Sequence, residues 1–163
     1  MSTFFSVTSY PLLAVLVFIG ALGVPLPLGV ALAAAGALAR QGHVSLFALF
    51  VLCTAAAVGG DCLGYGIGRY GVAAVLARTH GRWRERICRW LESPRISAAL
   101  TRGGGLGLGM WMLVFITRWA LTAPSPVVNV LAGLQRYRWE SFLIADSIGE
   151  ALWVALSLAQ GYW

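Results

Sequence analysis

VSLFALFVLCTAAAVGGDCLGYGIG, residues 44–68, is a run of 25 residues in which Asp61 is the only charged side chain. A membrane-spanning helix needs about 20 apolar residues to cross a hydrocarbon core of about 30 Å. The run is long enough to cross with some tilt, and Arg69 follows it directly. It predicts a transmembrane helix over residues 44–68.

The rest of the chain has the same character. Of its 163 residues, 59% are hydrophobic and 11% are charged, whereas roughly 25% are charged in ordinary soluble domains. A second apolar run, residues 141–160, lies between pairs of aromatic residues, as expected for a span between two aromatic belts. The composition argues against a soluble enzyme and predicts one all-α polytopic membrane domain over residues 1–163.

Two further apolar segments, residues 12–43 and 106–135, are each interrupted by prolines. Proline removes a backbone donor and breaks a helix, and broken backbone at membrane depth must be covered by protein or line a water-filled cavity. We predict two re-entrant helical hairpins that shelter each other near mid-membrane. Their tips are expected at Pro25, Pro27 and Gly29 in the first hairpin and at Pro124 and Pro126 in the second.

The same three motifs recur in the same order in two halves of the chain. Pro-x-Pro, Ala-Gly and Asp-x-x-Gly stand at 25–27, 35–36 and 61–64, and again at 124–126, 132–133 and 146–149. If each half is a hairpin followed by a span, the two halves cross the membrane in opposite directions. Such inverted repeats, with paired broken segments, place the substrate site of secondary transporters between them.

The halves are joined by a basic region, residues 69–105. Eight of the twelve arginines lie between Arg69 and Arg102, the chain has no lysine, and its net charge is +6. Because basic loops stay in the cytoplasm, we expect this loop on the cytoplasmic side of a bacterial inner membrane. Nucleic-acid binding is disfavoured, because this basic region lies between membrane segments.

Residues 82–92 have amphipathic spacing, which predicts either an interfacial helix or a basic loop packed on the protein. If they form an interfacial helix, anionic headgroups bind Arg82, Arg84, Arg86 and Arg89.

Charged residues inside the apolar segments are the candidates for function, because burial in a membrane is costly. Arg118 is the only charge in residues 103–135, and its guanidinium could bind a phosphate or carboxylate in two-pronged fashion. Neutralisation of a structural acid is the alternative. The other candidates for the transport site are Asp61, Asp146 and Glu150, as proton-exchanging groups or salt-bridge partners, and Asn129, as a hydrogen-bonding group in the second hairpin.

Glycines at four-residue spacing predict close helix packing. Gly60, Gly64 and Gly68 form a small-xxx-small pattern on one face of the first span, which lets a second helix approach closely. Gly149 is expected to act in the same way in the second span.

Known catalytic and ligand-binding patterns are missing. The three cysteines, Cys53, Cys62 and Cys88, show no CxxC spacing, so neither a metal site nor a disulfide framework is indicated. The glycines in residues 103–109 lack the surrounding elements of a phosphate-binding loop. We expect no cofactor, no metal and no enzymatic activity.

Residues 60–71, GDCLGYGIGRYG, resemble the GD-x-x-x-Y-x-x-G-R-x-x-G signature of the DedA family, also called SNARE-associated or VTT-domain membrane proteins. Residues 25–27, 35–36, 115–119 and 132–162 resemble further elements of that family. The resemblance implies two facing re-entrant hairpins, translocation of a phospholipid or lipid carrier, and in some members dependence on the proton motive force. Two departures matter: Gly29 stands where many members have an acid, and a second arginine common in the second hairpin is missing near Pro124.

These observations lead to one functional hypothesis and two rivals. The favoured hypothesis is an inner-membrane transporter that flips or scrambles an anionic lipid or lipid carrier, with Arg118 at the headgroup; proton coupling and a homo-oligomer stay open. The rivals are a membrane scaffold whose buried charges are structural, and an intramembrane enzyme acting on lipid phosphate.

Overall fold

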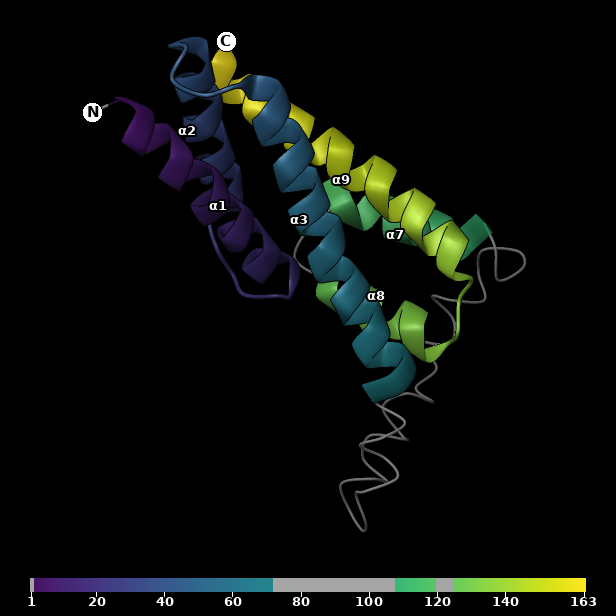
Figure 1. Ribbon diagram of the computed structural model, residues 1–163. Helices are drawn as coiled ribbons and strands as arrows, with labels where there is room; N and C mark the ends of the chain where they lie inside the picture. Colours follow the sequence, from purple (N-terminus) through teal and green to yellow (C-terminus); the bar gives the residue numbers. More distant parts are fainter. Residues whose placement is uncertain (1, 72–107, 120–124) are drawn as a thin grey trace.

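A computed structural model of the chain describes residues 2–71, 108–119 and 125–163, and this part is built of helices alone. Figure 1 shows two long helices crossing the molecule with shorter helices packed along them. In chain order the elements are α1 (Ser2–Ala21), α2 (Leu28–Arg40), α3 (Leu46–Gly66), the π-helical turn η1 (Ile67–Gly71), α7 (Leu108–Trp119), α8 (Ser125–Leu134) and α9 (Trp139–Tyr162).

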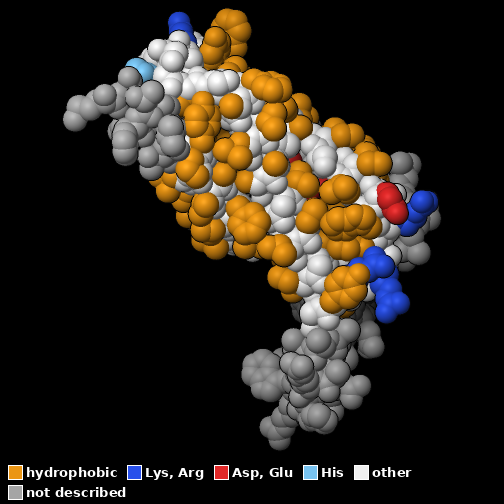
Figure 2. Space-filling model, in the orientation of Figure 1, with side chains coloured by type: hydrophobic (Ala, Val, Ile, Leu, Met, Phe, Trp, Pro, Cys, Tyr) orange, Lys and Arg blue, Asp and Glu red, His pale blue; other side chains and the backbone are white. Residues whose placement is uncertain are grey.

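Two of these helices are long and apolar enough to cross a membrane. They are α3 continued by η1, with 26 residues, and α9, with 24 residues. In their most apolar stretches only 28% and 44% of the residues are buried inside the protein, so neither is the enclosed core helix of a soluble protein. Hydrophobic side chains cover much of the face seen in Figure 2. On α9, Ile144, Ile148, Leu152 and Leu156 are exposed at four-residue spacing.

Each long helix is preceded by two shorter helices, and the first two are separated by a break. α1 ends at Ala21, Gly23 takes the left-handed conformation with φ +103°, and α2 begins after Pro27. Residues 24–27 are not helical, because prolines at 25 and 27 cannot donate to a helical ladder. Between α7 and α8, residues 120–124 lie outside the described residues.

The short helices exchange partners between the two halves of the chain. α1 packs on α3 and α7 packs on α9, whereas α2 packs on α9 and α8 packs on α3 and η1. Glycines make the exchanged contacts backbone to backbone: a Cβ at Gly36 would strike the carbonyl oxygen of Leu158, and a Cβ at Gly133 would strike that of Tyr65. Two separate hydrophobic clusters result, one among α1, α2, α3 and α9 and one among α3, α7, α8 and α9.

The helix bounds differ from the predicted segments by a few residues, except at the N-terminus. α1 begins at Ser2 rather than near residue 12, and the first span continues through η1 to Gly71 rather than ending at residue 68. α9 exceeds the predicted 141–160 by two residues at each end. Most of the basic region 69–105 lies outside the described residues, and so do the four arginines assigned to lipid headgroups there.

Candidate functional site

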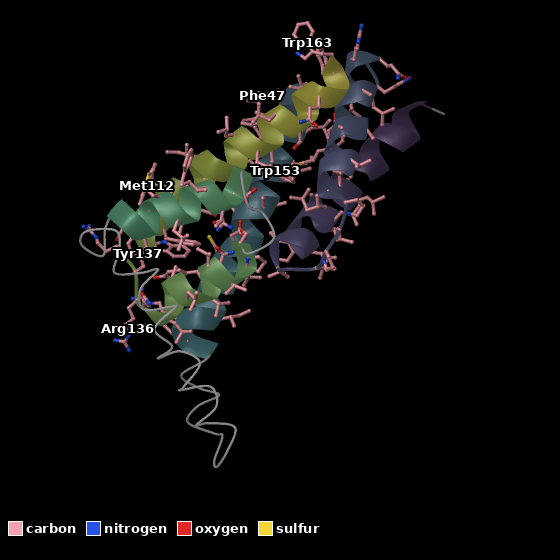
Figure 3. All side chains as sticks on the ribbon, turned by 180° about the vertical axis from the view of Figure 1, so that it is seen from behind. Phe47, Met112, Arg136, Tyr137, Trp153 and Trp163 are labelled. Atoms are coloured by element: carbon pink, nitrogen blue, oxygen red, sulfur yellow. The ribbon has the colours of Figure 1, made fainter. Side chains whose placement is uncertain are left out.

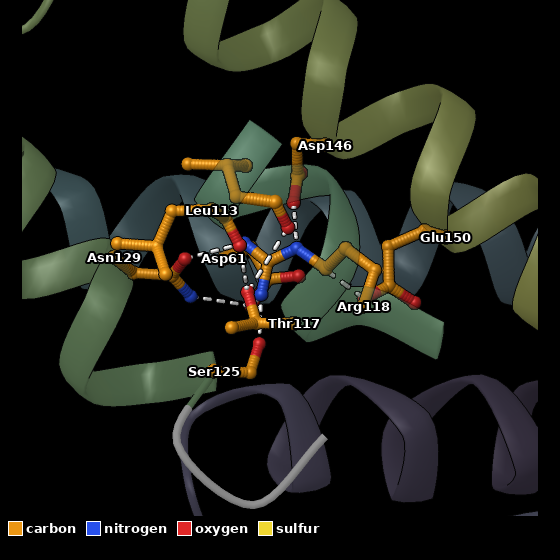
Figure 4. Close-up of polar contacts among 9 residues, drawn as sticks. Asp61, Leu113, Thr117, Arg118, Ser125, Asn129, Asp146 and Glu150 are labelled. Carbon is orange, nitrogen blue, oxygen red and sulfur yellow. Dashed lines mark hydrogen bonds and ion pairs between the residues drawn. The ribbon is translucent and has the colours of Figure 1, made fainter. Parts of the chain in front are cut away.

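Arg118 lies in the last turn of α7 and is almost completely buried, with 1% of its surface exposed. Gly149 of α9 makes room for it, since a Cβ at this position would lie 2.7 Å from the Cβ and Cγ of Arg118. The guanidinium therefore enters the centre of the molecule between α3, α8 and α9 (Figure 4).

Three carboxylates surround this guanidinium. Asp146 of α9 lies closest, with Oδ1 2.5 Å from Nε of Arg118; Asp61 of α3 follows at 3.5 Å from Nη1, and Glu150 at 3.7 Å from Nε. One oxygen of each acid lies within 4.8 Å of the others. The acids thus come from both halves of the chain and share one cation.

Two neutral side chains of α8 complete the cluster. Arg118 donates hydrogen bonds to Oγ of Ser125 through Nη1 and to Oδ1 of Asn129 through Nη2. The amide nitrogen of Asn129 in turn donates to Oδ1 of Asp61 over 2.6 Å. Asn129 therefore links the arginine and the acid of the other half, which fixes the orientation of its amide.

The cluster holds a surplus of negative charge. Three ionised carboxylates and one guanidinium leave two negative charges in a buried place, which is costly unless a further positive group compensates. Within the described residues, Oδ2 of Asp61 and Oδ2 of Asp146 accept no hydrogen bond, and Oδ1 of Asp146 has only its ion pair with Nε of Arg118. The site therefore has acceptor capacity for protons or for a ligand's donors.

A cavity of about 550 Å³ opens beside the cluster. Asp61, Arg118, Ser125 and Glu150 form its polar part, and the remainder of its lining is apolar or glycine, including residues 23–30 at the break between α1 and α2. Trp153 of α9, labelled in Figure 3, also borders it. The cavity thus has a charged end and an apolar wall, as an amphipathic ligand requires.

The structure brings together every residue proposed for the transport site. Arg118, Asp61, Asp146, Glu150 and Asn129 form one buried network. Four of the five hairpin-tip residues, namely Pro25, Pro27, Gly29 and Pro126, line the adjoining cavity, and the fifth, Pro124, lies outside the described residues.

The glycines of the first span contact two helices rather than one. Gly60 faces Ala21 and the carbonyl oxygen of Phe18 in α1, whereas Gly64 faces Asn129 and Gly68 faces Val130 in α8. The spacing of four residues therefore accommodates a helix from each half.

Ser125 was not proposed from the sequence, although it contacts Arg118 and borders the cavity. Serine followed by proline is a common start of a helix, and α8 does begin there. The role of Ser125 at the helix start explained the residue, so its contact with Arg118 could not be inferred from the sequence. Thr117 is buried next to Arg118, but its hydroxyl donates to the carbonyl oxygens of Leu113 and Val114 over 2.9 and 3.0 Å.

The three acids also have the chemistry of a hard-cation site, since carboxylate oxygens suit Ca²⁺ and Mg²⁺. However, the Arg118 guanidinium already lies among them, at 2.5 Å from Asp146, and would repel a divalent ion. We therefore assign no metal or cofactor to this cluster.

The arrangement of a buried mixed-charge cluster between broken helices can be compared with known proteins. Neither a curated protein nor a solved structure matches the chain. Residues 24–162 match the family model of the VTT domain, and this range contains every residue of the cluster. The chain therefore belongs to the VTT-domain, or DedA/SNARE-associated, family of membrane proteins, as its residues 60–71 suggested.

Proposed function

We propose that the protein transports an anionic lipid or lipid carrier across the membrane, with its headgroup bound at Arg118. The observation that carries this proposal is the position of the guanidinium, which borders the polar end of a cavity whose remaining wall is apolar. A planar guanidinium binds phosphate oxygens through two parallel hydrogen bonds. An acyl or isoprenyl chain suits the apolar wall near residues 23–30.

The three acids explain how such binding is made reversible. In the arrangement described, carboxylates hold the guanidinium, and their surplus negative charge repels an anion. Protonation of two of the three acids, Asp61, Asp146 and Glu150, removes that surplus charge and releases donors of Arg118 for the headgroup. The carboxylates and the lipid headgroup thus compete for one guanidinium. This competition couples the uptake of protons to the binding of lipid, even though Gly29 stands where many members of the family have an acid.

The proposed pathway includes an inverted repeat of the two halves, which a matching register in the sequence supports. LVFI occurs at residues 16–19 and again at 113–116, a separation of 97 positions, and the same separation relates Pro27 to Pro124 and Ala35-Gly36 to Ala132-Gly133. The packing follows this register, since Gly36 meets α9 as Gly133 meets α3. In this register the two Pro-x-Pro motifs are offset by two residues, so Pro27 rather than Pro25 corresponds to Pro124.

The register also supports assigning the headgroup to the second hairpin. Ala21, Leu28 and Leu32 of the first half correspond to Arg118, Ser125 and Asn129 of the second. Of the two hairpins, the second therefore supplies the polar lining residues, Arg118 and Ser125, beside Asp61 and Glu150 of the long helices, and the first supplies apolar wall. Both are proposed to re-enter the membrane, facing each other across the cavity; in support, a Cβ at Gly23 would lie 3.1 Å from Cγ of Pro126.

We place the protein in a bacterial inner membrane as a multi-pass protein, with the Arg69–Arg102 loop in the cytoplasm. The concentration of arginines in that loop supports this orientation. Arg136 and Arg138, between α8 and α9, belong on the same side, because α3 ends and α9 begins at that end of the molecule (Figure 1).

One observation favours the scaffold as a second candidate. The guanidinium of Arg118 already contacts five protein side chains and is nearly inaccessible. A structural counter-ion would look the same. The transporter and the scaffold predict different results when the charges of Arg118 and its acids are removed. A purely structural network of charges can be replaced without loss of activity.

Reconstitution into liposomes tests the proposal. The purified chain is incorporated into vesicles with a trace of fluorescent phosphatidylglycerol, phosphatidylethanolamine or isoprenyl phosphate in the inner leaflet, and the appearance of each probe outside is followed. We expect accelerated movement of an anionic lipid relative to protein-free vesicles. Rates equal to those of empty vesicles for every probe would favour the scaffold, and new lipid products in mass spectra would favour the intramembrane enzyme.

A further inference from the structure

A second hollow lies where α3 begins and α9 ends, away from the charge cluster. Its volume is about 420 Å³. It is lined by Leu46, Phe47 and Phe50 of α3, by four residues of α9 between Ala155 and Tyr162, and by Trp163. It shares no lining residue with the cavity at Arg118. Phe47 and Trp163, 76% and 91% exposed, project at this end of the molecule (Figure 3). We call this hollow the α3–α9 groove.

The opposite end of the molecule has an aromatic cluster where this end has the groove. There Trp139, the first residue of α9, packs on Tyr65 with ring centroids 5.2 Å apart, and Phe142 packs on the same ring at 4.8 Å. The phenol of Tyr65 donates a 2.6 Å hydrogen bond to the carbonyl oxygen of Tyr137. An indole and its neighbours therefore close the space between the end of α3 and the start of α9.

The proposed repeat shows why the two ends differ. Gly161 faces the carbonyl oxygen of Ala33 as Gly68 faces that of Val130, so residues of the two long helices correspond at a separation of 93. In that register Leu46 occupies the place of Trp139. Leucine is much smaller than tryptophan, and the groove is the space that the missing indole would fill.

The charge at the groove's end indicates what fills it. Arg40, in the last turn of α2, is exposed and donates through Nη1 to the main-chain oxygen of Trp163 over 2.8 Å. A guanidinium has five N–H donors, so most remain for a further acceptor. No carboxylate side chain lies at this end within residues 2–71, 108–119 and 125–163. An apolar groove that ends at an exposed arginine with unused N–H donors matches a lipid chain that ends in a phosphate.

We propose that the α3–α9 groove binds one membrane phospholipid, with an acyl chain between Leu46 and Leu158 and the phosphate at Arg40. This lipid is a resident of the fold and not the transported cargo. The lipid fills the space between α3 and α9 at one end of the molecule, as Trp139 fills the corresponding space at the other end. The proposal does not depend on transport, because the groove and the Arg118 cavity are separate.

The test uses the full chain in detergent, with native mass spectrometry and thermal unfolding. Phosphatidylglycerol is the probe, and diacylglycerol, which has the same chains and no phosphate, is compared with it. For the unaltered protein we expect one retained phosphatidylglycerol and a higher Tm on its addition. Arg40→Gln should weaken phosphatidylglycerol binding about tenfold, since a charge-assisted hydrogen bond is lost, and leave diacylglycerol binding unchanged.

Leu46→Trp fills the groove with the side chain used at the other end. It should abolish retention of both lipids while the Tm without lipid stays equal or rises. Ile148→Trp, which adds an indole on an exposed face outside the groove, is the matched control and should retain lipid. If Leu46→Trp does not yield folded protein, Ala159→Leu makes the same test. Lipid retention by a folded groove-filling variant equal to that of the control would overturn the proposal.

Discussion

At the scale of single residues, the central feature is one arginine shared by acids from both halves of the chain. Asp61 belongs to α3, Asp146 and Glu150 to α9, and all three lie within 4 Å of Arg118. Because one guanidinium cannot neutralise three carboxylates, the cluster must take up positive charge when it is buried. This imbalance, more than the arginine alone, distinguishes the site from an ordinary structural ion pair.

Ser125→Ala removes a neutral partner of Arg118 without changing the charge of the cluster. Hydrogen bonds to charged groups contribute about 1.5–3 kcal/mol, so we expect the initial rate of lipid translocation to fall by about tenfold or more. Ser125→Thr keeps the hydroxyl and is the matched control. Unchanged translocation in a folded Ser125→Ala protein would show that this hydroxyl has no part in lipid binding.

At the scale of helices, the fold depends on the exchange of α2 and α8 between the two long helices. Each exchanged contact brings two backbones together at a glycine, namely Gly36 and Gly161 for α2 with α9, and Gly68 and Gly133 for α8 with α3 and η1. Since lipid tails are as apolar as the side chains, close packing rather than the hydrophobic effect must hold these helices together.

Gly68→Ala and Gly66→Ala provide a matched pair in the first span. A Cβ at position 68 would strike the backbone of Val130, whereas one at position 66 meets nothing within 4 Å. We expect Gly68→Ala to lower the free energy of unfolding by about 1–3 kcal/mol through overpacking. Gly66→Ala should be neutral or stabilise the helix by up to about 1 kcal/mol.

Thermal unfolding of the two variants in one detergent makes this comparison. The two proteins differ only in the position of one methyl group, so expression and detergent effects are shared. Equal melting temperatures would mean that α8 does not pack closely against the first span.

Much of this architecture could be predicted from the sequence. The two long apolar helices, the break at Pro25 and Pro27, and the members of the charge cluster follow from length, composition and the cost of buried charge. Partner exchange could not be predicted, because α2 and α8 are apolar on most faces and no periodicity specifies which long helix each one contacts. The packing relates the two halves by a separation of 97 residues, as the repeated LVFI does. The more conspicuous Pro-x-Pro motifs lie 99 residues apart, which is a register two residues away.

At the scale of the whole molecule, the account requires a defined orientation in the membrane. We expect the Arg69–Arg102 loop in the cytoplasm, because it carries eight of the twelve arginines. A single cysteine at position 84 in a protein without Cys53, Cys62 and Cys88 should react with a membrane-impermeant reagent only after the cells are lysed. Strong labelling in intact cells would reverse the orientation.

The central claim, that Arg118 binds the transported headgroup, is tested most directly by lipid translocation in vesicles containing Arg118→Ala, alone and combined with Asp146→Asn. The single variant leaves three acids buried without their shared cation, which should cost at least about 3–5 kcal/mol of stability, and the double variant should recover the part of that loss that is due to Asp146. Arg118→Lys should rescue translocation poorly, since an ammonium lacks the planar fork.

The account predicts that the double variant is stable, reaches the membrane and still translocates anionic lipid no faster than empty vesicles. Full translocation by that double variant would contradict the account and make Arg118 a structural counter-ion.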